Sequence, residues 1–295
     1  MKLVTYSTGA DRATGFLVDD HIFDLQAAGN HADIRLPEDT SLLGIANTEY
    51  LPLLREMAGS FPKPVDESWC RPIKDVLLHA PYRPHQNILI AGGNTSDEFV
   101  AQRTRNGKPK LRYHTKAPSA VADPGTPITW PRELTSQVHA EPHVAVIMGA
   151  RTLFADTDDV LDNVFGYTVA TNINSYDLKR KHGQWDKAVS LDTFFPWGPV
   201  VVTADDVSVP ELACRLWLND KMAVSGNAES GLLKTAEILS EISFGMTLEP
   251  GDVVLTGTAE SIGHGEVPER WLQDGDVIRS GIASICEIEN PVETY

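Results

Sequence analysis

The sequence is poor in features that would point to a secreted, metal-knuckle or membrane protein. Its three cysteines, Cys70, Cys214 and Cys286, are scattered and include no C-x-x-C spacing. This argues against a disulfide framework and a zinc knuckle, and is typical of a cytoplasmic protein with reduced thiols. No apolar run approaches membrane-spanning length, and the N-terminus turns polar too soon for a signal peptide. We therefore expect a cytoplasmic protein with no membrane partner.

Positive charge is also scarce. The 295 residues include 25 Lys and Arg against 41 Asp and Glu, a formal net charge of −16. Such a surface repels phosphate backbones and anionic lipids, so we expect no nucleic-acid partner. Local charge dominates at a small-molecule site, and a small-molecule substrate is therefore compatible with this composition.

Several catalytic and nucleotide-binding motifs are missing. We find no G-x-G-x-x-G with an acidic partner, no P-loop and no H-E-x-x-H, which argues against dinucleotide binding, P-loop chemistry and a zincin. There is no G-x-S-x-G either, which argues against a serine hydrolase.

The most distinctive stretch that is present runs from His139 to Gly149. In a strand, residues two apart share a face, so His139, Glu141 and His143 would point the same way. Pro142 cannot donate to a ladder and predicts an edge, a bulge or a strand entry. Such a cluster is costly to bury unless it binds something or pairs internally. A solvated strand edge is the alternative.

Strands outnumber helices and do not alternate regularly with them, which favours an α+β, mostly β architecture. The first 25 residues predict short strands with a hairpin at Asp19-Asp20. Helical spacing over 41–58 and 235–244, and strand alternation over 167–174, predict further elements. A change of pattern near 75–80 predicts a small N-terminal domain over 1–78 and a larger domain over 79–295.

Four ordered segments resemble the fumarylacetoacetate hydrolase family. They are Gly251–Thr258 with Gly263 and Gly265, Phe165–Ala170, the stretch from Gly183-Gln184-Trp185 through Ser190–Phe194 to Gly198-Pro199, and Leu272–Val277. The resemblance covers roughly residues 85–293. It implies the family's mixed β-roll as the C-terminal domain, a small N-terminal α+β domain, and usually a homodimer.

The resemblance also implies a metal site that has been rewritten. Family members typically hold Mg²⁺, Mn²⁺ or Ca²⁺ with three carboxylates, and the corresponding positions here are Glu141, His143 and Asn172. One carboxylate remains, which weakens affinity for hard cations such as Mg²⁺. Imidazole ligation by His143 would move the preference toward Zn²⁺, Mn²⁺ or Fe²⁺. The alternative is that no metal binds and the three residues form a hydrogen-bonded polar cluster.

Other departures concern proton transfer and substrate binding. Glu98 stands where many members have a water-activating histidine, and is either a base with a raised pKa or an exposed helix residue. Val189 replaces a lysine of the family. Thr258 matches a residue that contacts the substrate carboxylate, and Lys116 and Gln184 are further candidates, either substrate-facing or structural.

The resulting expectation is an enzyme that acts on a small 2-oxo acid or β-dicarbonyl compound through enolate stabilisation. Carbon–carbon bond hydrolysis is the default. The missing histidine favours a lyase, isomerase or cyclase that needs no activated water. His139 and His143 could also do acid–base work without a metal. A non-catalytic ligand-binding relative is the alternative from another class.

Overall fold

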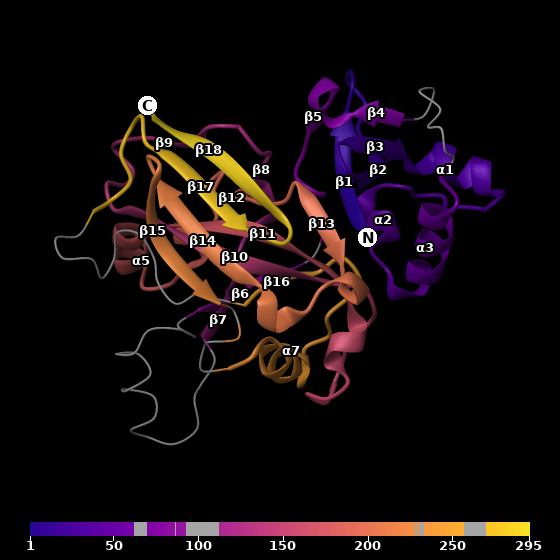
Figure 1. The fold of residues 1–295 in the computed structure, drawn as a ribbon. Helices are drawn as coiled ribbons and strands as arrows, with labels where there is room; N and C mark the ends of the chain where they lie inside the picture. Colours follow the sequence, from indigo (N-terminus) through magenta and orange to yellow (C-terminus); the bar gives the residue numbers. More distant parts are fainter. Residues whose placement is uncertain (62–69, 86, 93–111, 228, 230–232, 257–269) are drawn as a thin grey trace.

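Among the residues described in the computed structural model, eleven strands form one mixed sheet (Figure 1). The structure describes residues 1–61, 70–85, 87–92, 112–227, 229, 233–256 and 270–295. The strand order is β4-β3-β2-β1-β13-β11-β10-β16-β6-β7, and β5 pairs with β1. The strands are β1 (Lys2–Ser7), β2 (Ala13–Val18), β3 (His21–Asp24), β4 (Cys70–Pro72), β5 (Leu77–Leu78), β6 (Ile88–Gly92), β7 (Arg112–Thr115), β10 (Val138–Met148), β11 (Val164–Ser175), β13 (Val200–Thr203) and β16 (Val253–Leu255).

The antiparallel pair β10–β11 forms the centre of this sheet. Its register runs from Val138 opposite Ser175 to Met148 opposite Val164. Both strands are almost wholly buried, because the sheet is covered on both faces. Between Val144 and Met148 alternate residues enter two different hydrophobic clusters, as the two-residue period of a strand requires. The central strands therefore form a rigid platform for any side chain they carry.

A second, five-stranded sheet packs against the first one. Its order is β15-β14-β17-β18-β9, and the hydroxyl of Thr171 on β11 donates to Ser280 on β17 over 2.6 Å. A parallel two-stranded pair joins β12 and β8. The strands are β8 (Val121–Ala122), β9 (Ile128–Trp130), β12 (Phe195–Pro196), β14 (Ala213–Leu218), β15 (Lys221–Asn227), β17 (Val277–Ile282) and β18 (Cys286–Thr294). The architecture confirms the predicted α+β, mostly β class.

The helices are short and lie around the sheets. The α-helices are α1 (Leu25–Ala32), α2 (Leu42–Ile45), α3 (Leu51–Gly59), α5 (Tyr176–His182), α6 (Asp186–Val189) and α7 (Thr235–Ser243), and the 3₁₀ turns are η1 (Thr48–Tyr50), η2 (Ile73–Asp75), η3 (Pro118–Ala120), η4 (Val160–Asn163), η5 (Ala204–Asp206) and η6 (Val209–Glu211). The helix predicted over 41–58 is divided, since Asn47 caps a separate turn. None of the helices in the described part of the chain is long and apolar enough to cross a membrane.

One local prediction was wrong. The sequence from Thr157 to Val164 predicts a short helix ended by Gly166, but Gly166 lies inside β11. A Cβ at Gly166 would stand 2.4 Å from the carbonyl oxygen of Val202 on the neighbouring strand β13. The glycine is required by this close approach of two strands and not by a helix terminus.

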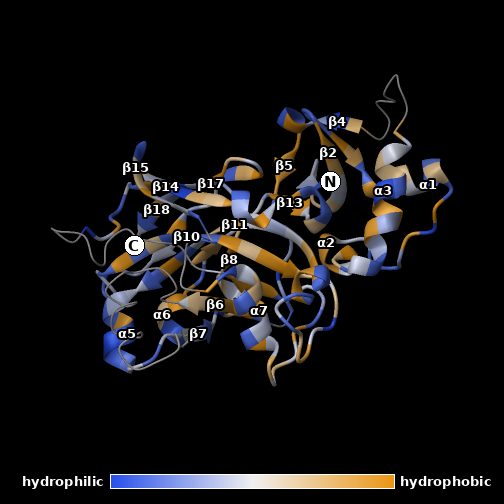
Figure 2. Ribbon diagram, turned by 60° about the horizontal axis from the view of Figure 1, so that its bottom comes forward, coloured by the Kyte–Doolittle hydropathy of each residue, from blue (hydrophilic) through white to orange (hydrophobic). Residues whose placement is uncertain are grey.

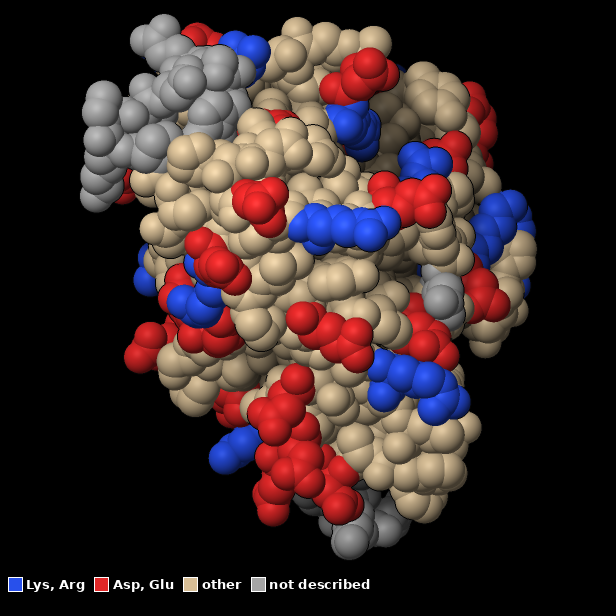
Figure 3. Space-filling model, turned by 90° about the vertical axis from the view of Figure 1, so that its right-hand side faces the viewer, with Lys and Arg blue, Asp and Glu red and all other residues tan. Residues whose placement is uncertain are grey.

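The N-terminal strands belong to the same sheet as the rest of the chain. β1 pairs with β13, with Lys2 opposite Val202, so the sheet continues across the predicted boundary at residue 78. Helices α1 and α3 lie at one end of the molecule in both ribbon views (Figures 1 and 2). The face seen from that end carries more acidic than basic side chains (Figure 3). The division into two domains stays a prediction.

Candidate active site

The polar cluster predicted on β10 forms on the central strand pair. His139, Glu141 and His143 occupy alternate positions of β10, and the antiparallel register places Asn172 opposite Glu141. Asn174 lies opposite His139 in the same ladder. The two-residue period of both strands therefore brings these side chains to one face.

Pro142 does not end the strand, but the ladder explains why it is tolerated. It lies inside β10 opposite Thr171. On its other side β10 pairs with β16 only from Ala145 to Ile147. No described strand pairs with Pro142 on the β16 side. Its lack of an N–H therefore removes no hydrogen bond between strands.

Glu141 is the electrostatic centre of the cluster. Its Oε2 accepts a hydrogen bond from Asn172 Nδ2 at 2.9 Å and lies 3.4 Å from His143 Nε2. His139 Nδ1 lies 3.9 Å from Glu141 Oε1. Burial would raise the pKa of Glu141, but the hydrogen bonds from His143 and Asn172 and the two nearby imidazoles lower it to about 2. Glu141 is therefore a carboxylate at every physiological pH.

The surroundings of this carboxylate are closed. The imidazole side chains of His139 and His143 are each 3% exposed, whereas that of Glu141 is 27% exposed. The ring of His139 lies edge-on to Trp271, with the ring centres 6.2 Å apart, and Trp271 stacks in turn on Tyr176. Glu141 is the member of the cluster that a ligand would meet first.

Two amide oxygens point to a ligand at the same place. Oδ1 of Asn172 and Oδ1 of Asn174 are buried and have no hydrogen-bond partner among the described residues. Buried acceptors are normally satisfied, and an unsatisfied one requires a reason. A cation or a hydrogen-bond donor of a bound molecule could satisfy either oxygen.

The structure adds His114, which the sequence analysis missed. Its ring on β7 stacks on Trp185 with 5.3 Å between ring centres and an angle of 14°. Burial lowers the pKa of His114 to about 4, against the pull of Glu141 and with small contributions from Lys116 and His143. These mutual charge effects place His114 in the electrostatic neighbourhood of Glu141. The alternation His114-x-Lys116 could have indicated this strand.

Lys116 is held by the backbone. Its Nζ donates to the carbonyl oxygens of Ile173 at 3.1 Å, of Phe194 at 2.9 Å and of Val189. Three carbonyls match the three N–H bonds of an ammonium group, so none remains for a substrate in this arrangement. Burial lowers the pKa of Lys116 well below its ordinary value, and the Glu141 carboxylate acts in the opposite direction. Lys116 ties β11 to the segment that carries Val189.

The other predicted substrate-binding residues are less informative. Gln184 is exposed, and its Oε1 accepts the N–H of Asp186 at 2.7 Å at the start of α6. Glu98 and Thr258 lie outside the described residues. The roles predicted for all three stay predictions.

A family model described as the fumarylacetoacetate (FAA) hydrolase C-terminal domain matches residues 88–293. The chain therefore belongs to the fumarylacetoacetate hydrolase family, as the four sequence segments indicated. Over 99% of its length it is 32% identical to the whole of the oxaloacetate tautomerase YisK of Bacillus subtilis. It is 33% identical to the mitochondrial oxaloacetate tautomerase fahd2 of Xenopus laevis, over 74% of this chain and 69% of the relative.

Solved structures show the same fold over the whole chain. A fumarylacetoacetate hydrolase from Exiguobacterium antarcticum superposes with a TM-score of 0.83 at 32% identity and covers 100% of both chains. The maleylpyruvate hydrolase from Sphingobium sp. SYK-6, in complex with manganese(II) and pyruvate, has a TM-score of 0.75 at 26% identity and covers 100% of this chain and 99% of that one. The family is thus one of enzymes, whose members named here are tautomerases and hydrolases. Hydrolysis as the default activity is not confirmed.

Proposed function

We propose that this chain catalyses the keto–enol tautomerisation of a small 2-oxo dicarboxylic acid, with oxaloacetate as the first candidate. The observation that carries the proposal is an ionised carboxylate, Glu141, between two buried imidazoles and a buried amide. Tautomerisation moves one proton between a carbon and a carbonyl oxygen and consumes no water. A proton carrier and a stabiliser of the enolate oxygen are sufficient for it. The names of the relatives from Bacillus subtilis and Xenopus laevis support this choice.

The low pKa of Glu141 determines which side chain transfers the proton. A carboxylate with a pKa of about 2 is a poor base for a proton on carbon at neutral pH. The proton is therefore carried by an imidazole, and Glu141 stabilises the imidazolium that forms. His139 Nδ1 and His143 Nε2 both face the Glu141 carboxylate, at 3.9 and 3.4 Å. Asn172 fixes the carboxylate through its Nδ2.

A divalent cation fits the residues of this site in composition. Glu141 supplies an ionised oxygen, Asn172 a buried Oδ1 that lacks a described partner, and His143 an imidazole nitrogen. A bound cation would polarise the 2-oxo group and stabilise the enolate. One carboxylate with neutral donors favours Mn²⁺, Zn²⁺ or Fe²⁺ over Mg²⁺. With His143 as a ligand, His139 carries the proton. No group of three or more His, Cys, Asp or Glu side chains suited to a metal occurs in the described part of the chain, so Asn172 is essential to such a site.

Carbon–carbon bond hydrolysis of an acylpyruvate is the second candidate. The similarity to the solved fumarylacetoacetate hydrolase favours it. Hydrolysis needs an activated water, for which Glu98 is the residue predicted here. Assembly as a homodimer also stays a prediction.

A substrate panel distinguishes the two activities. The enol and keto forms of oxaloacetate differ in ultraviolet absorbance, so their interconversion is followed directly in the presence of the purified chain. We expect accelerated conversion of oxaloacetate and little cleavage of acylpyruvates. Cleavage of an acylpyruvate without any effect on oxaloacetate would replace the proposal by hydrolysis, and inactivity on both would favour a non-catalytic relative.

Elemental analysis of the purified protein tests the cation. We expect one divalent ion per chain in the wild type, and its loss in Asn172→Ala and in His143→Ala. A wild-type chain that is active and metal-free after dialysis against a chelator would show that His139 and His143 catalyse the reaction without a metal.

A further inference from the structure

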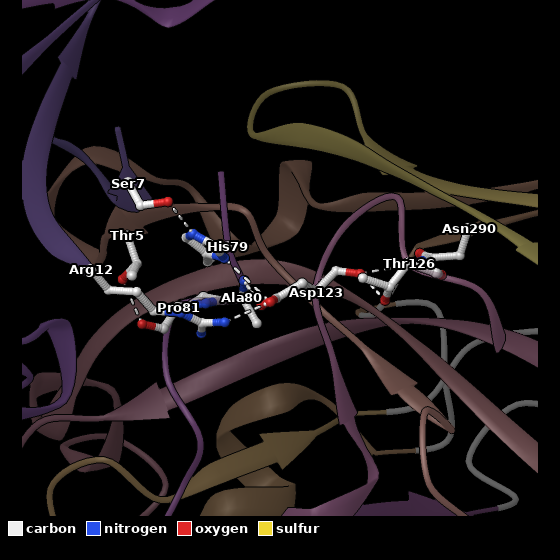
Figure 4. A network of polar contacts seen from close by, with 9 residues as sticks. All are labelled: Thr5, Ser7, Arg12, His79, Ala80, Pro81, Asp123, Thr126 and Asn290. Carbon is white, nitrogen blue, oxygen red and sulfur yellow. Dashed lines mark hydrogen bonds and ion pairs between the residues drawn. The ribbon is translucent and has the colours of Figure 1, made fainter. Parts of the chain in front are cut away.

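A second polar network joins the N-terminal segment to the rest of the chain (Figure 4). The hydroxyl of Ser7, at the end of β1, lies 2.8 Å from Nε2 of His79. The other ring nitrogen, Nδ1 of His79, lies 3.2 Å from Oδ2 of Asp123. Serine, histidine and aspartate thus meet in the order in which a nucleophile, its base and the residue that orients the base are arranged.

The environment fixes this arrangement. Ser7 is 6% and His79 7% exposed. Oδ1 of Asp123 accepts the N–H of Ala80 at 2.9 Å, so the carboxylate is held beside the imidazole. A carboxylate can only accept, and Nδ1 of His79 therefore carries the proton while Nε2 accepts from Ser7. This is the tautomer that can remove a proton from the serine hydroxyl.

Ser7 also borders a cavity of about 210 Å³. The cavity is lined by residues of β1, of the turn to β2 and of the neighbouring strands and helix, among them Tyr6, Ser7, Thr8, Asp11, Asp24 and Arg71. None of the lining residues belongs to β10 or β11. The cavity is therefore separate from the site around Glu141, and its size fits a small molecule.

We propose that Ser7 is a nucleophile activated by His79, and that this second site reacts with small acyl esters. Ser7 Oγ attacks the acyl carbonyl carbon while its proton passes to His79 Nε2, and the ester C–O bond breaks as the alcohol leaves with that proton. Water then releases the acid and restores Ser7. No G-x-S-x-G surrounds Ser7, but such triads are defined by geometry and not by sequence position.

The charges around the cavity restrict the acyl group. Among the described residues that line it, Asp11 and Asp24 supply carboxylates and Arg71 supplies the one guanidinium. The carboxylate excess disfavours a negatively charged substrate. The site should thus take short neutral acyl groups, such as acetyl, and reject the oxo acids proposed for the Glu141 site.

The test uses the full chain, p-nitrophenyl acetate as substrate and a fluorophosphonate as a covalent probe. We expect the probe on Ser7 in the wild type, found by peptide mass spectrometry, and the labelling rate to fall on the order of 100-fold in His79→Gln. The control variant Ser208→Ala, at an exposed serine, should label and hydrolyse the ester like the wild type.

Circular dichroism shows whether His79→Gln is folded. If it is not, the wild type alone decides, because an activated Ser7 must label faster than the exposed Ser208 in the same sample. Absence of label on Ser7 in folded wild type, or equal labelling in a folded His79→Gln variant, would overturn the proposal and leave the network as a structural tie.

Discussion

The chain contains two buried clusters built from similar side chains, and they differ in how completely their polar atoms are satisfied. Around Glu141, the amide oxygens of Asn172 and Asn174 have no partner among the described residues. In the second cluster, the side chains of Ser7 and Asp123 are both hydrogen-bonded to the ring of His79. The first arrangement leaves two buried acceptors open to a ligand, whereas the second is complete in itself and owes any reactivity to the cavity beside Ser7.

The largest effect on catalysis is expected from Glu141→Gln. The substitution keeps the size of the side chain but removes the charge that stabilises an imidazolium and any bound cation. We expect kcat/KM for oxaloacetate tautomerisation to fall about 100- to 1,000-fold. Glu293→Gln, at an exposed carboxylate, is the control and should match the wild type. Full activity in Glu141→Gln would show that catalysis takes place at another site.

Lys116→Met is expected to act on stability. The variant removes the ammonium group that donates to the carbonyl oxygens of Ile173, Val189 and Phe194. These three acceptors stay buried without that donor. We expect a loss of about 3 kcal/mol in the free energy of unfolding, measured by urea titration. The exposed Lys187→Met serves as the control. Unchanged stability with a raised KM would instead indicate that Lys116 faces the substrate.

His114 should make stability depend on pH. Burial lowers its pKa from the ordinary histidine value of 6.5 to about 4 in the folded chain, so the unfolded chain binds the proton more readily. The contribution of His114 to the free energy of unfolding is fully present above pH 6.5 and falls by about 3 kcal/mol as the pH drops from 6.5 to 4.

Urea titrations at a series of pH values measure this loss. It should be reduced in His114→Phe and unchanged in the control His21→Gln, at an exposed histidine. An equal slope in wild type and His114→Phe would show that His114 is not the group that titrates.

The smallest effect is expected for Arg12→Gln in the second cluster. Arg12 Nη2 lies 2.6 Å from Asp123 Oδ2, but the side chains are 51% and 23% exposed. Exposed ion pairs contribute little, and we expect a change of less than about 1 kcal/mol in the unfolding free energy. A larger loss, comparable to that of Asp123→Ala, would mean that the ion pair and not the N–H of Ala80 holds the carboxylate.

The sequence was sufficient to place His139, Glu141 and His143 on one face, because the two-residue period of a strand is local. Family resemblance added Asn172, whose position depends on the register of β10 against β11. The basic, proline-containing segment from Lys108 to Ala120 predicts a loop, and the alternation His114-x-Lys116 is too short to outweigh that pattern. His114 lies on β7 and Lys116 directly follows it, and the pairing of β7 with β6 is not visible in the local sequence.

The second cluster illustrates what local patterns cannot give. Ser7, His79 and Asp123 come from three separated segments with no motif around any of them. Lack of G-x-S-x-G argued against a serine nucleophile, yet the three side chains meet in space. Tertiary packing decides such contacts, and the sequence predicts neither the distances nor the orientation of the His79 ring.

Proton transfer by His139 and His143 is tested most directly by the rate of enol-to-keto conversion of oxaloacetate. The rate is measured for the wild type, His139→Ala and His143→Ala. His21→Ala, at an exposed histidine, is the control. We expect acceleration by the wild type and by His21→Ala, and a loss on the order of 100-fold in each of the other two variants. Full activity in both His139→Ala and His143→Ala, or no acceleration by the wild type, would contradict this expectation.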